Sequence, residues 1–254
     1  MEQEISEKQR EALDQFGFRS AVPLFRRTDE SADHLATGIF IAVGCRVFLL
    51  TARHILDKCK PEDVAIATSP EGSALQTLGN LVVHKPIDVP GADIDIVAIE
   101  LLDDETKRII YDGWRVIDPS MGGDAYGTGE LVLIGYPSET LKMEGINIKG
   151  GPTGIITAPL ALTPSNANPT ANPALDFFLQ LPRRAVVVGG QVVEIPAIQG
   201  MSGCAIWELR EVAEGALWSP DRALRFVGIQ SSAKPGHYFR GKRWSFVKAM
   251  LDQA

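Results

Sequence analysis

The sequence contains few cysteines. Its 254 residues include only Cys45, Cys59 and Cys204, an odd number with no Cys-x-x-C pair. This count argues against a disulfide-stapled secreted scaffold and is typical of a reducing compartment. Clusters of cysteine and histidine at the short spacings of a zinc site are also missing from the sequence. We therefore expect no metal or organic cofactor.

Long apolar runs are absent as well. No segment approaches the roughly 20 apolar residues that a membrane-spanning helix needs. The chain starts with mixed acidic and basic side chains (MEQEISEKQREALDQ) and lacks the basic and apolar regions of a secretory signal. We expect a cytoplasmic protein with no membrane partner.

Positive charge is not in excess. The chain has 25 lysines and arginines against 32 aspartates and glutamates, which gives a formal net charge of −7. This balance argues against a nucleic-acid partner. Local basic clusters occur at Arg183-Arg184 and at Arg240, Lys242 and Arg243. We expect both clusters to form solvated surface.

Glycine and proline, in contrast, are frequent, with 24 and 16 residues. They separate short runs of valine, isoleucine, leucine and phenylalanine, a pattern typical of many short strands joined by turns. The runs GIFIAV (38–43) and RVFLLTA (46–52) are joined by Gly44-Cys45 and predict a β-hairpin. Further strands are expected at 64–68, 80–84, 95–101, 130–136, 154–158, 185–190, 204–209 and 225–231.

Helical patterns occur only at the two ends of the chain. Residues at about 3–16 are good helix formers, and the spacing of Trp244, Val247 and Leu251 predicts a C-terminal helix. The segment 162–176 is rich in proline and asparagine and has no apolar period. We expect it to be a long exposed loop.

Two segments contain residues suited to acid–base chemistry. His54 follows the apolar strand 47–50, at the point where a buried strand emerges into a loop, so it would be rigid and still reachable. Asp93 and Asp95 precede the apolar run 96–101, and a carboxylate there needs a partner. They can be a pair of turn acids, or one of them can orient a histidine.

A third segment is QGMSGCA, in which Ser202 lies between glycines. Gly200 and Gly203 permit close turns that aim backbone N–H groups at a developing oxyanion. An ordinary turn explains the same letters. The G-x-S-x-G elbow of α/β-hydrolases is not met, because position 204 is cysteine and the alternation of strands and helices is missing.

Together these three segments resemble the trypsin-like (chymotrypsin-fold) serine proteases. TARHIL resembles their T-A-x-H segment, DIVAIEL their D-I-A-x-L-x-L strand and GMSGC their G-x-S-G-G, in the order His, Asp, Ser. TGIFIA, VVHKP, LIGYP, GPTGIITA and FVGIQS also look like this family, so the resemblance covers roughly residues 22–232. The sequence is most similar to the stand-alone bacterial trypsin-like peptidase domain related to the HtrA type.

The resemblance implies an all-β fold of two antiparallel β-barrels with terminal helices. Its expected boundaries are 1–20 for an N-terminal helical extension, 21–118 for the first barrel, 119–240 for the second barrel and 241–254 for a C-terminal helix.

The resemblance also implies roles for individual residues. His54 would be the general base and Ser202 the nucleophile. Asp95 rather than Asp93 would orient the histidine, because it directly precedes Ile-Val-Ala-Ile. The backbone N–H groups of Gly200 and Ser202 would form the oxyanion hole.

The family pattern further suggests how a substrate binds. Ser231, Ser232 and Ala233 would form the strand edge that pairs with an extended substrate. Pro196 would form the floor of the primary specificity pocket and favour an apolar side chain before the cut bond. Glu194 is the competing floor residue and would favour a basic side chain.

Two positions depart from the family pattern. Cys204 replaces the second glycine after the serine, and we expect this small side chain to be tolerated. Met201 stands where secreted trypsins have an acid that pairs with a newly cut N-terminus. We therefore expect activity that does not depend on cleavage of the N-terminal segment.

The sequence thus predicts an intracellular serine endopeptidase that hydrolyses protein substrates through an acyl-enzyme. Its expected partners are a protein or peptide substrate and a regulatory protein. Two alternatives stay open. The chain can be a catalytically degenerate trypsin-like domain that acts as a protein-binding module, or an esterase that uses the same triad.

Overall fold

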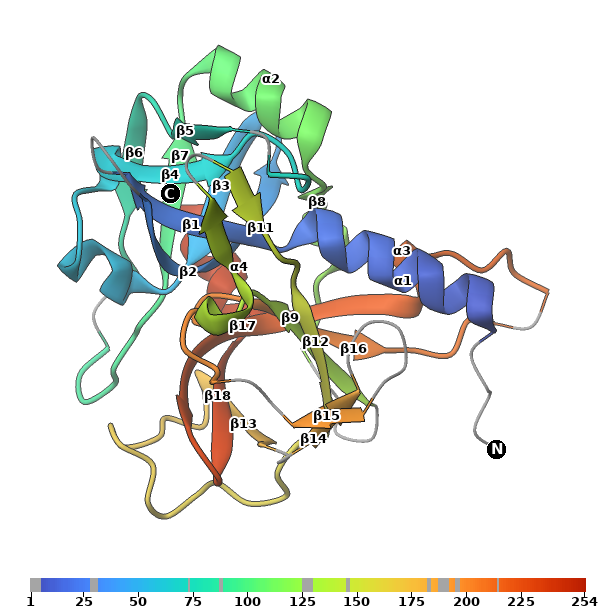
Figure 1. The fold of residues 1–254 in the computed structure, drawn as a ribbon. Coiled ribbons are helices and arrows are strands. Elements are labelled where there is room, and N and C mark those ends of the chain that lie inside the picture. The colour runs from blue at the N-terminus through green and yellow to red at the C-terminus, as the bar shows by residue number, and fades with distance from the viewer. Residues whose placement is uncertain are drawn as a thin grey trace.

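The computed structural model describes most of the chain. The described residues are 6–27, 32–72, 74–86, 89–124, 130–144, 147–181, 184–186, 192–194, 197–213 and 215–254. They form two large curled sheets with few helices (Figure 1). The expected all-β class with two antiparallel half-barrel sheets is confirmed. In the described part of the chain, no helix is long and apolar enough to cross a membrane.

The first sheet has eight strands in the order β5-β4-β1-β2-β3-β7-β6, with β8 paired to β2. All neighbours are antiparallel except the short pair β2 and β8. Gly44 turns the predicted β2–β3 hairpin with a φ of 62°. The strand bounds are β1 (Val22–Arg27), β2 (Ala32–Val43), β3 (Arg46–Thr51), β4 (Val64–Ala67), β5 (Leu75–Thr77), β6 (Leu81–His84), β7 (Val97–Leu101) and β8 (Val116–Ile117).

The second sheet has six antiparallel strands in the order β12-β9-β16-β17-β18-β13. Two small two-stranded ribbons, β10–β11 and β14–β15, accompany it. The bounds are β9 (Leu131–Gly135), β10 (Lys142–Glu144), β11 (Asn147–Lys149), β12 (Thr153–Thr157), β13 (Asp176–Gln180), β14 (Arg184–Val186), β15 (Val192–Glu194), β16 (Ala205–Leu209), β17 (Leu224–Lys234) and β18 (Tyr238–Arg243).

The described helices are α1 (Glu7–Ser20), α2 (Asp104–Gly113), α3 (Pro220–Ala223) and α4 (Trp244–Gln253). A capping box between Ser6 and Gln9 begins α1. The expectation that helices occur only at the chain ends is wrong, because α2 lies on the outer side of the first sheet (Figure 1). Asp103 starts this helix by accepting hydrogen bonds from the backbone N–H and the hydroxyl of Thr106, both at 2.7 Å.

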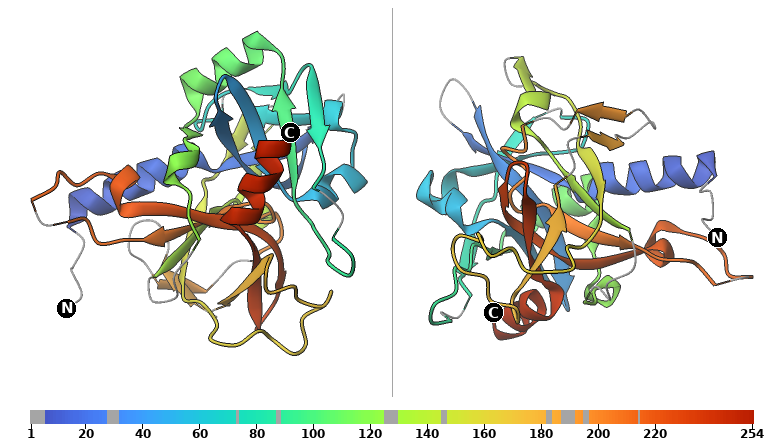
Figure 2. Two further views of the ribbon diagram at one scale, coloured as in Figure 1. Left: turned by 180° about the vertical axis from the view of Figure 1, so that it is seen from behind. Right: turned by 90° about the horizontal axis from the view of Figure 1, so that it is seen from below.

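A shared core joins the two sheets. It combines Phe16 of α1, Ile41 of β2, Trp207 of β16 and Trp244 of α4. The rings of Phe16 and Trp207 meet edge to face with centroids 5.1 Å apart. Both terminal helices therefore contribute side chains to this core. Figure 2 shows the two helices from behind and from below.

The second sheet contains a buried ionic cluster. Side chains of Arg240 and Lys242 are only 2% and 1% exposed, and both bind the carboxylate of Asp176. The expectation of a solvated basic surface is therefore wrong for these two residues, and the expected loop 162–176 ends in a buried acid. The reason is register, since Asp176 of β13 lies directly opposite Lys242 of β18. Arg183, part of the other basic cluster, lies outside the described residues.

Candidate active site

His54 and Asp95 are in direct contact. His54 lies in a short 3-10 helix, η1 (Arg53–Asp57), that follows β3. Its Nδ1 is 2.7 Å from Asp95 Oδ2, and its backbone N–H donates to Asp95 Oδ1 at 2.8 Å. A carboxylate beside Nδ1 holds the proton on that nitrogen. The arrangement leaves Nε2 as the nitrogen that can accept a proton.

Asp93 occupies a different position. Its carboxylate is 4.0 Å from Arg53 in a pair whose side chains are both more than one-third exposed. Its backbone oxygen accepts a hydrogen bond from Lys242 Nζ at 2.5 Å. The structure therefore brings Asp95, and not Asp93, to the histidine. The buried cluster around Lys242 anchors the segment from which Asp95 projects.

Ser202 lies in a tight loop just before β16. Gly200 and Gly203 have φ angles of 93° and 88°, which side chains other than glycine's rarely adopt. A Cβ on Gly203 would lie 2.3 Å from Thr37 O and 2.6 Å from Ala52 N. The loop therefore packs against Ala52, which follows the end of β3 and precedes His54 by two residues. No hydrogen bond joins Ser202 Oγ to His54 among the described residues, and such bonds often tighten only when substrate binds.

The N–H groups around Ser202 fall into two sets. Those of Met201, Gly203 and Cys204 donate to backbone carbonyls at 2.8 to 3.1 Å. Those of Gly200 and Ser202 make no hydrogen bond within the described residues. These two donors are the ones that the sequence assigns to an oxyanion hole, and both are available to an external acceptor.

The segment Ser231–Ala233 lies at the end of β17. On one side it pairs with β18, where Ser232 lies opposite Arg240 and Ala233 opposite Phe239. On its other side β16 begins only at Ala205, opposite Ile229, so no described strand pairs with the segment there. This edge can accept an extended chain as an additional strand.

The residues expected to form a specificity pocket are described only in part. Pro196, its expected floor, lies outside the described residues. Glu194 ends β15 and its side chain is exposed. The next described residue, Ala197, donates its N–H to Glu139 Oε1 at 2.8 Å.

The two positions that depart from the family pattern are core residues. Met201 is fully buried in the second sheet's own core, and Cys204 packs in the same cluster. Burial raises the pKa of the Cys204 thiol far above its usual range, so the thiol stays protonated. Neither side chain is available for chemistry at the surface.

Three site neighbours were not singled out from the sequence. Thr37 of β2 donates its N–H to Ser202 O at 3.0 Å and its hydroxyl to Gly200 O at 2.9 Å. His34 Nδ1 lies 2.9 Å from Ser138 Oγ, beside Gly200. Burial lowers the pKa of His34 to about 4, so its imidazole is neutral near pH 7. Of these three residues, only Thr37 lies in a segment, TGIFIA, that resembles the trypsin-like family in sequence.

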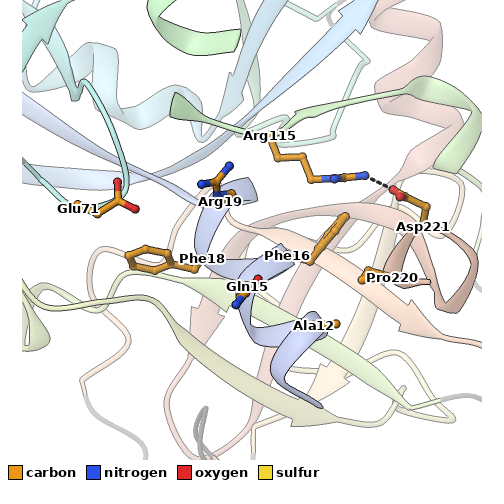
Figure 3. A pocket seen from close by; sticks show the side chains of 9 residues that line it. All are labelled: Ala12, Gln15, Phe16, Phe18, Arg19, Glu71, Arg115, Pro220 and Asp221. Carbon is orange, nitrogen blue, oxygen red and sulfur yellow. Dashed lines mark hydrogen bonds and ion pairs between the residues drawn. The ribbon is translucent and has the colours of Figure 1, made fainter. Parts of the chain in front are cut away.

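A cavity of about 590 Å³ lies elsewhere, against α1 (Figure 3). Arg115 crosses it, pairs with Asp221 and lies over the ring of Phe16. Its lining residues are Ala12, Gln15, Phe16, Phe18, Arg19, Glu71, Arg115, Pro220 and Asp221. None of these belongs to the candidate active site, and none is a serine, threonine, cysteine or histidine. The described residues also contain no group of three or more side chains suited to hold a metal ion.

Comparison with known proteins supports the fold. No family model and no curated protein matches the chain in sequence. The structure is similar to the scabies mite inactivated protease paralogue S-I1, with a TM-score of 0.54 and 16% identity over 95% of this chain and 96% of that one. Human heparin binding protein gives a TM-score of 0.54 and 13% identity over 95% and 92%.

A third similar structure concerns the coupled folding and binding of the intrinsically disordered Sesbania mosaic virus VPg protein. It gives a TM-score of 0.51 and 13% identity over 92% of this chain and 90% of that one. At these identities the likeness shows the trypsin-like fold alone. Because one of these proteins is named as inactivated, the fold does not separate an enzyme from a degenerate relative, and the relation to the HtrA type stays a prediction.

Proposed function

We propose that this chain is a serine endopeptidase. The observation that supports this most strongly is the pair of hydrogen bonds between Asp95 and His54. The loop that contains Ser202 packs against Ala52, which precedes His54 by two residues in the sequence. An acid that orients a histidine beside a loop serine is the constellation of nucleophilic acyl transfer.

The proposed reaction begins at Ser202. Its Oγ attacks the carbonyl carbon of the scissile peptide bond while His54 Nε2 takes the hydroxyl proton. Asp95 stabilises the resulting imidazolium and keeps its Nδ1 proton in place. The negative charge that develops on the carbonyl oxygen is stabilised by the N–H groups of Gly200 and Ser202.

The tetrahedral intermediate then collapses. The C–N bond breaks, and His54 gives its proton to the leaving amine, which leaves an ester between Ser202 and the acyl part of the substrate. A water molecule then attacks the ester carbonyl carbon while His54 takes a proton from it. The C–O bond to Ser202 breaks, and His54 returns the proton to Ser202 Oγ. The carboxylic acid product leaves and the Ser202 hydroxyl is restored.

The rival role as a protein-binding module has less support. A degenerate domain needs none of the three side chains, yet this chain keeps all of them and joins two by short hydrogen bonds. An esterase would use the same triad. The unpaired edge at Ser231–Ala233 favours a peptide, because an extended backbone can pair with it and a simple ester cannot.

The cysteines favour the cytoplasm as the place of action. Cys45, Cys59 and Cys204 are all free thiols, as expected of a protein in a reducing compartment. We propose a protein or an extended peptide as the substrate that the enzyme meets there.

A fluorophosphonate probe, which reacts with activated serines, tests the proposal. The wild-type protein should gain one probe per chain, mapped to Ser202, and Ser202→Ala should gain none. Ser245→Ala removes an exposed serine on α4 and serves as the matched control, with full labelling expected. Equal labelling of Ser202→Ala and wild type, or no labelling of either, would contradict the enzyme assignment. Turnover of peptides against esters with matched leaving groups then separates peptidase from esterase.

A further inference from the structure

Every backbone carbonyl from Gln199 to Ser202 accepts a hydrogen bond. Their donors are, in chain order, the Ser138 N–H at 2.7 Å, the Thr37 hydroxyl at 2.9 Å, the Cys204 N–H at 3.0 Å and the Thr37 N–H at 3.0 Å. Four consecutive peptide units are thus fixed from their carbonyl side. Two of the four donors come from the first sheet and one from the turn after β9.

The fixed carbonyls determine where the N–H groups point. In a planar trans peptide the C=O and the following N–H point in opposite directions. Because Gln199 O is bound by Ser138, the Gly200 N–H must point away from Ser138. Because Met201 O is bound within the loop, the Ser202 N–H is fixed in the same way. Thr37 binds the carbonyls of Gly200 and Ser202, and so holds the peptide units on both sides of the Met201–Ser202 peptide. These are the two N–H groups without a partner in the described chain.

We propose that Thr37 and Ser138 are positioning residues that hold the oxyanion hole in its active form. The inference rests on the proposed function, because it assigns regulation to that same site. In secreted trypsins a newly cut N-terminus and an acid order this loop; here Met201 replaces the acid and is buried. Thr37 and Ser138, which we call the oxyanion latch, take over that role without proteolysis.

The surroundings hold the latch itself in place. Thr51 Oγ1 donates to Thr37 O at 2.7 Å, and the Thr37 hydroxyl accepts a hydrogen bond from Tyr136 N at 2.9 Å. His34 holds Ser138 through the 2.9 Å contact between Nδ1 and Oγ. A Cβ on Gly200 would lie 2.5 Å from both His34 and Ser138, so only glycine fits between them.

Ser138→Pro removes the one N–H that binds Gln199 O. Ser138 is the first residue of the 3-10 helix η4 (Ser138–Thr140), a position that accepts proline. The preceding Pro137 has a ψ of 134°, which suits a residue before proline. Losing one oxyanion donor should lower kcat by about 10²- to 10³-fold with KM nearly unchanged, because the interaction forms only in the transition state. Ser138→Ala keeps this N–H and loses only the contact with His34, so its kcat should fall much less than that of Ser138→Pro.

Thr37 gives an independent second test. Thr37→Val keeps the side-chain shape but removes the hydroxyl, and we expect kcat to fall about tenfold with little change in KM. Thr37→Ser restores the hydroxyl and should restore kcat. Thr157→Val is the matched control, because Thr157 is also buried and donates to a carbonyl, Gln180 O, away from Ser202. Wild-type kcat in both Ser138→Pro and Thr37→Val would overturn the latch.

A structural readout separates failure of the latch from failure of the proposed function. Crystal structures of Ser202→Ala and of Ser138→Pro/Ser202→Ala report the direction of the Gly200 N–H without any need for turnover. The latch predicts that this N–H faces the Ser202 side chain position in the first and is turned away in the second. The same direction in both structures would overturn the latch. If the wild type is active, the kcat values of the Thr37 and Ser138 variants test the latch. If the wild type is inert, only the proposed function is overturned, because the two crystal structures still test the latch.

Discussion

Both carboxylate oxygens of Asp95 are bound by His54, one by the ring Nδ1 at 2.7 Å and one by the backbone N–H at 2.8 Å. The carboxylate therefore fixes the ring orientation and the position of the η1 backbone together. Asp93, two residues earlier, contacts Arg53 instead. This difference makes the two acids a matched pair for mutagenesis.

Asp95→Asn should severely reduce turnover. The amide keeps the shape of the side chain but can present an N–H to Nδ1, which favours the wrong tautomer of His54. We expect kcat to fall about 10⁴-fold, as for the same change in other triads. Asp93→Asn should have a mild effect, because an exposed ion pair contributes little. Comparable losses in the two variants, measured by steady-state peptide hydrolysis, would contradict the assignment.

The chain should be active with its N-terminal helix in place. Phe16 of α1 is buried against Trp207 at the junction of the sheets, so the N-terminal helix is part of the fold. Phe16→Ala should lower the free energy of unfolding by about 3–5 kcal/mol, measured by urea denaturation. An inert 254-residue chain that gains activity when residues 1–20 are removed would show that the helix is an inhibitory segment instead.

His34 should make stability depend on pH. Burial lowers its pKa from 6.5 to about 4 in the folded protein, with the charge of Lys58 acting in the same direction. Above pH 6.5 the residue is neutral in both states and its stability contribution is complete. Between pH 6.5 and 4 the unfolded chain binds the proton more readily, so stability falls as pH falls, by about 3 kcal/mol in total.

His34→Asn isolates this contribution, because asparagine does not titrate and its amide can still reach Ser138 Oγ. Urea denaturation between pH 4 and 7 should show a smaller loss of stability in the variant than in the wild type. Parallel curves for the two proteins would show that His34 is not the group responsible.

Asp176 should contribute strongly to the stability of the fold. Burial raises its pKa, but hydrogen bonds from Arg240 and Lys242 outweigh that effect, and the pKa stays below its usual value. Asp176→Asn leaves two buried cations without a counter-charge and should cost about 3–5 kcal/mol. Thermal unfolding of the variant measures this cost. Asp221→Asn, at a partly exposed ion pair, is the control and should have a small effect.

The sequence predicted those features that short strings encode. The β2–β3 hairpin follows from two apolar runs around Gly44, the N-terminal helix from its good helix formers and the C-terminal helix from the spacing of its apolar residues. The choice of Asp95 over Asp93 came from the resemblance to the trypsin-like proteases, in which the acid directly precedes an apolar strand. The helix α2 was not predicted, although the acidic cap at Asp103 is a local signal for the start of a helix.

Other features depend on which strands become neighbours. Arg240 and Lys242 resemble a surface cluster until β13 places Asp176 opposite Lys242, 66 residues away in the sequence. The contacts of Thr37 with Gly200 and Ser202 likewise join segments more than 160 residues apart. No local pattern contains such pairings, because they arise only when the two sheets pack together.

If Ser202 cleaves peptide bonds, each cut creates a new protein N-terminus that can be mapped. A cytosolic protein mixture is incubated with wild-type protein or with Ser202→Ala, and the N-termini are labelled and identified by mass spectrometry. If Ser202 is the nucleophile of a peptidase, new N-termini should appear with the wild type and be absent with Ser202→Ala. The same new N-termini with both proteins, or none with either, would contradict it.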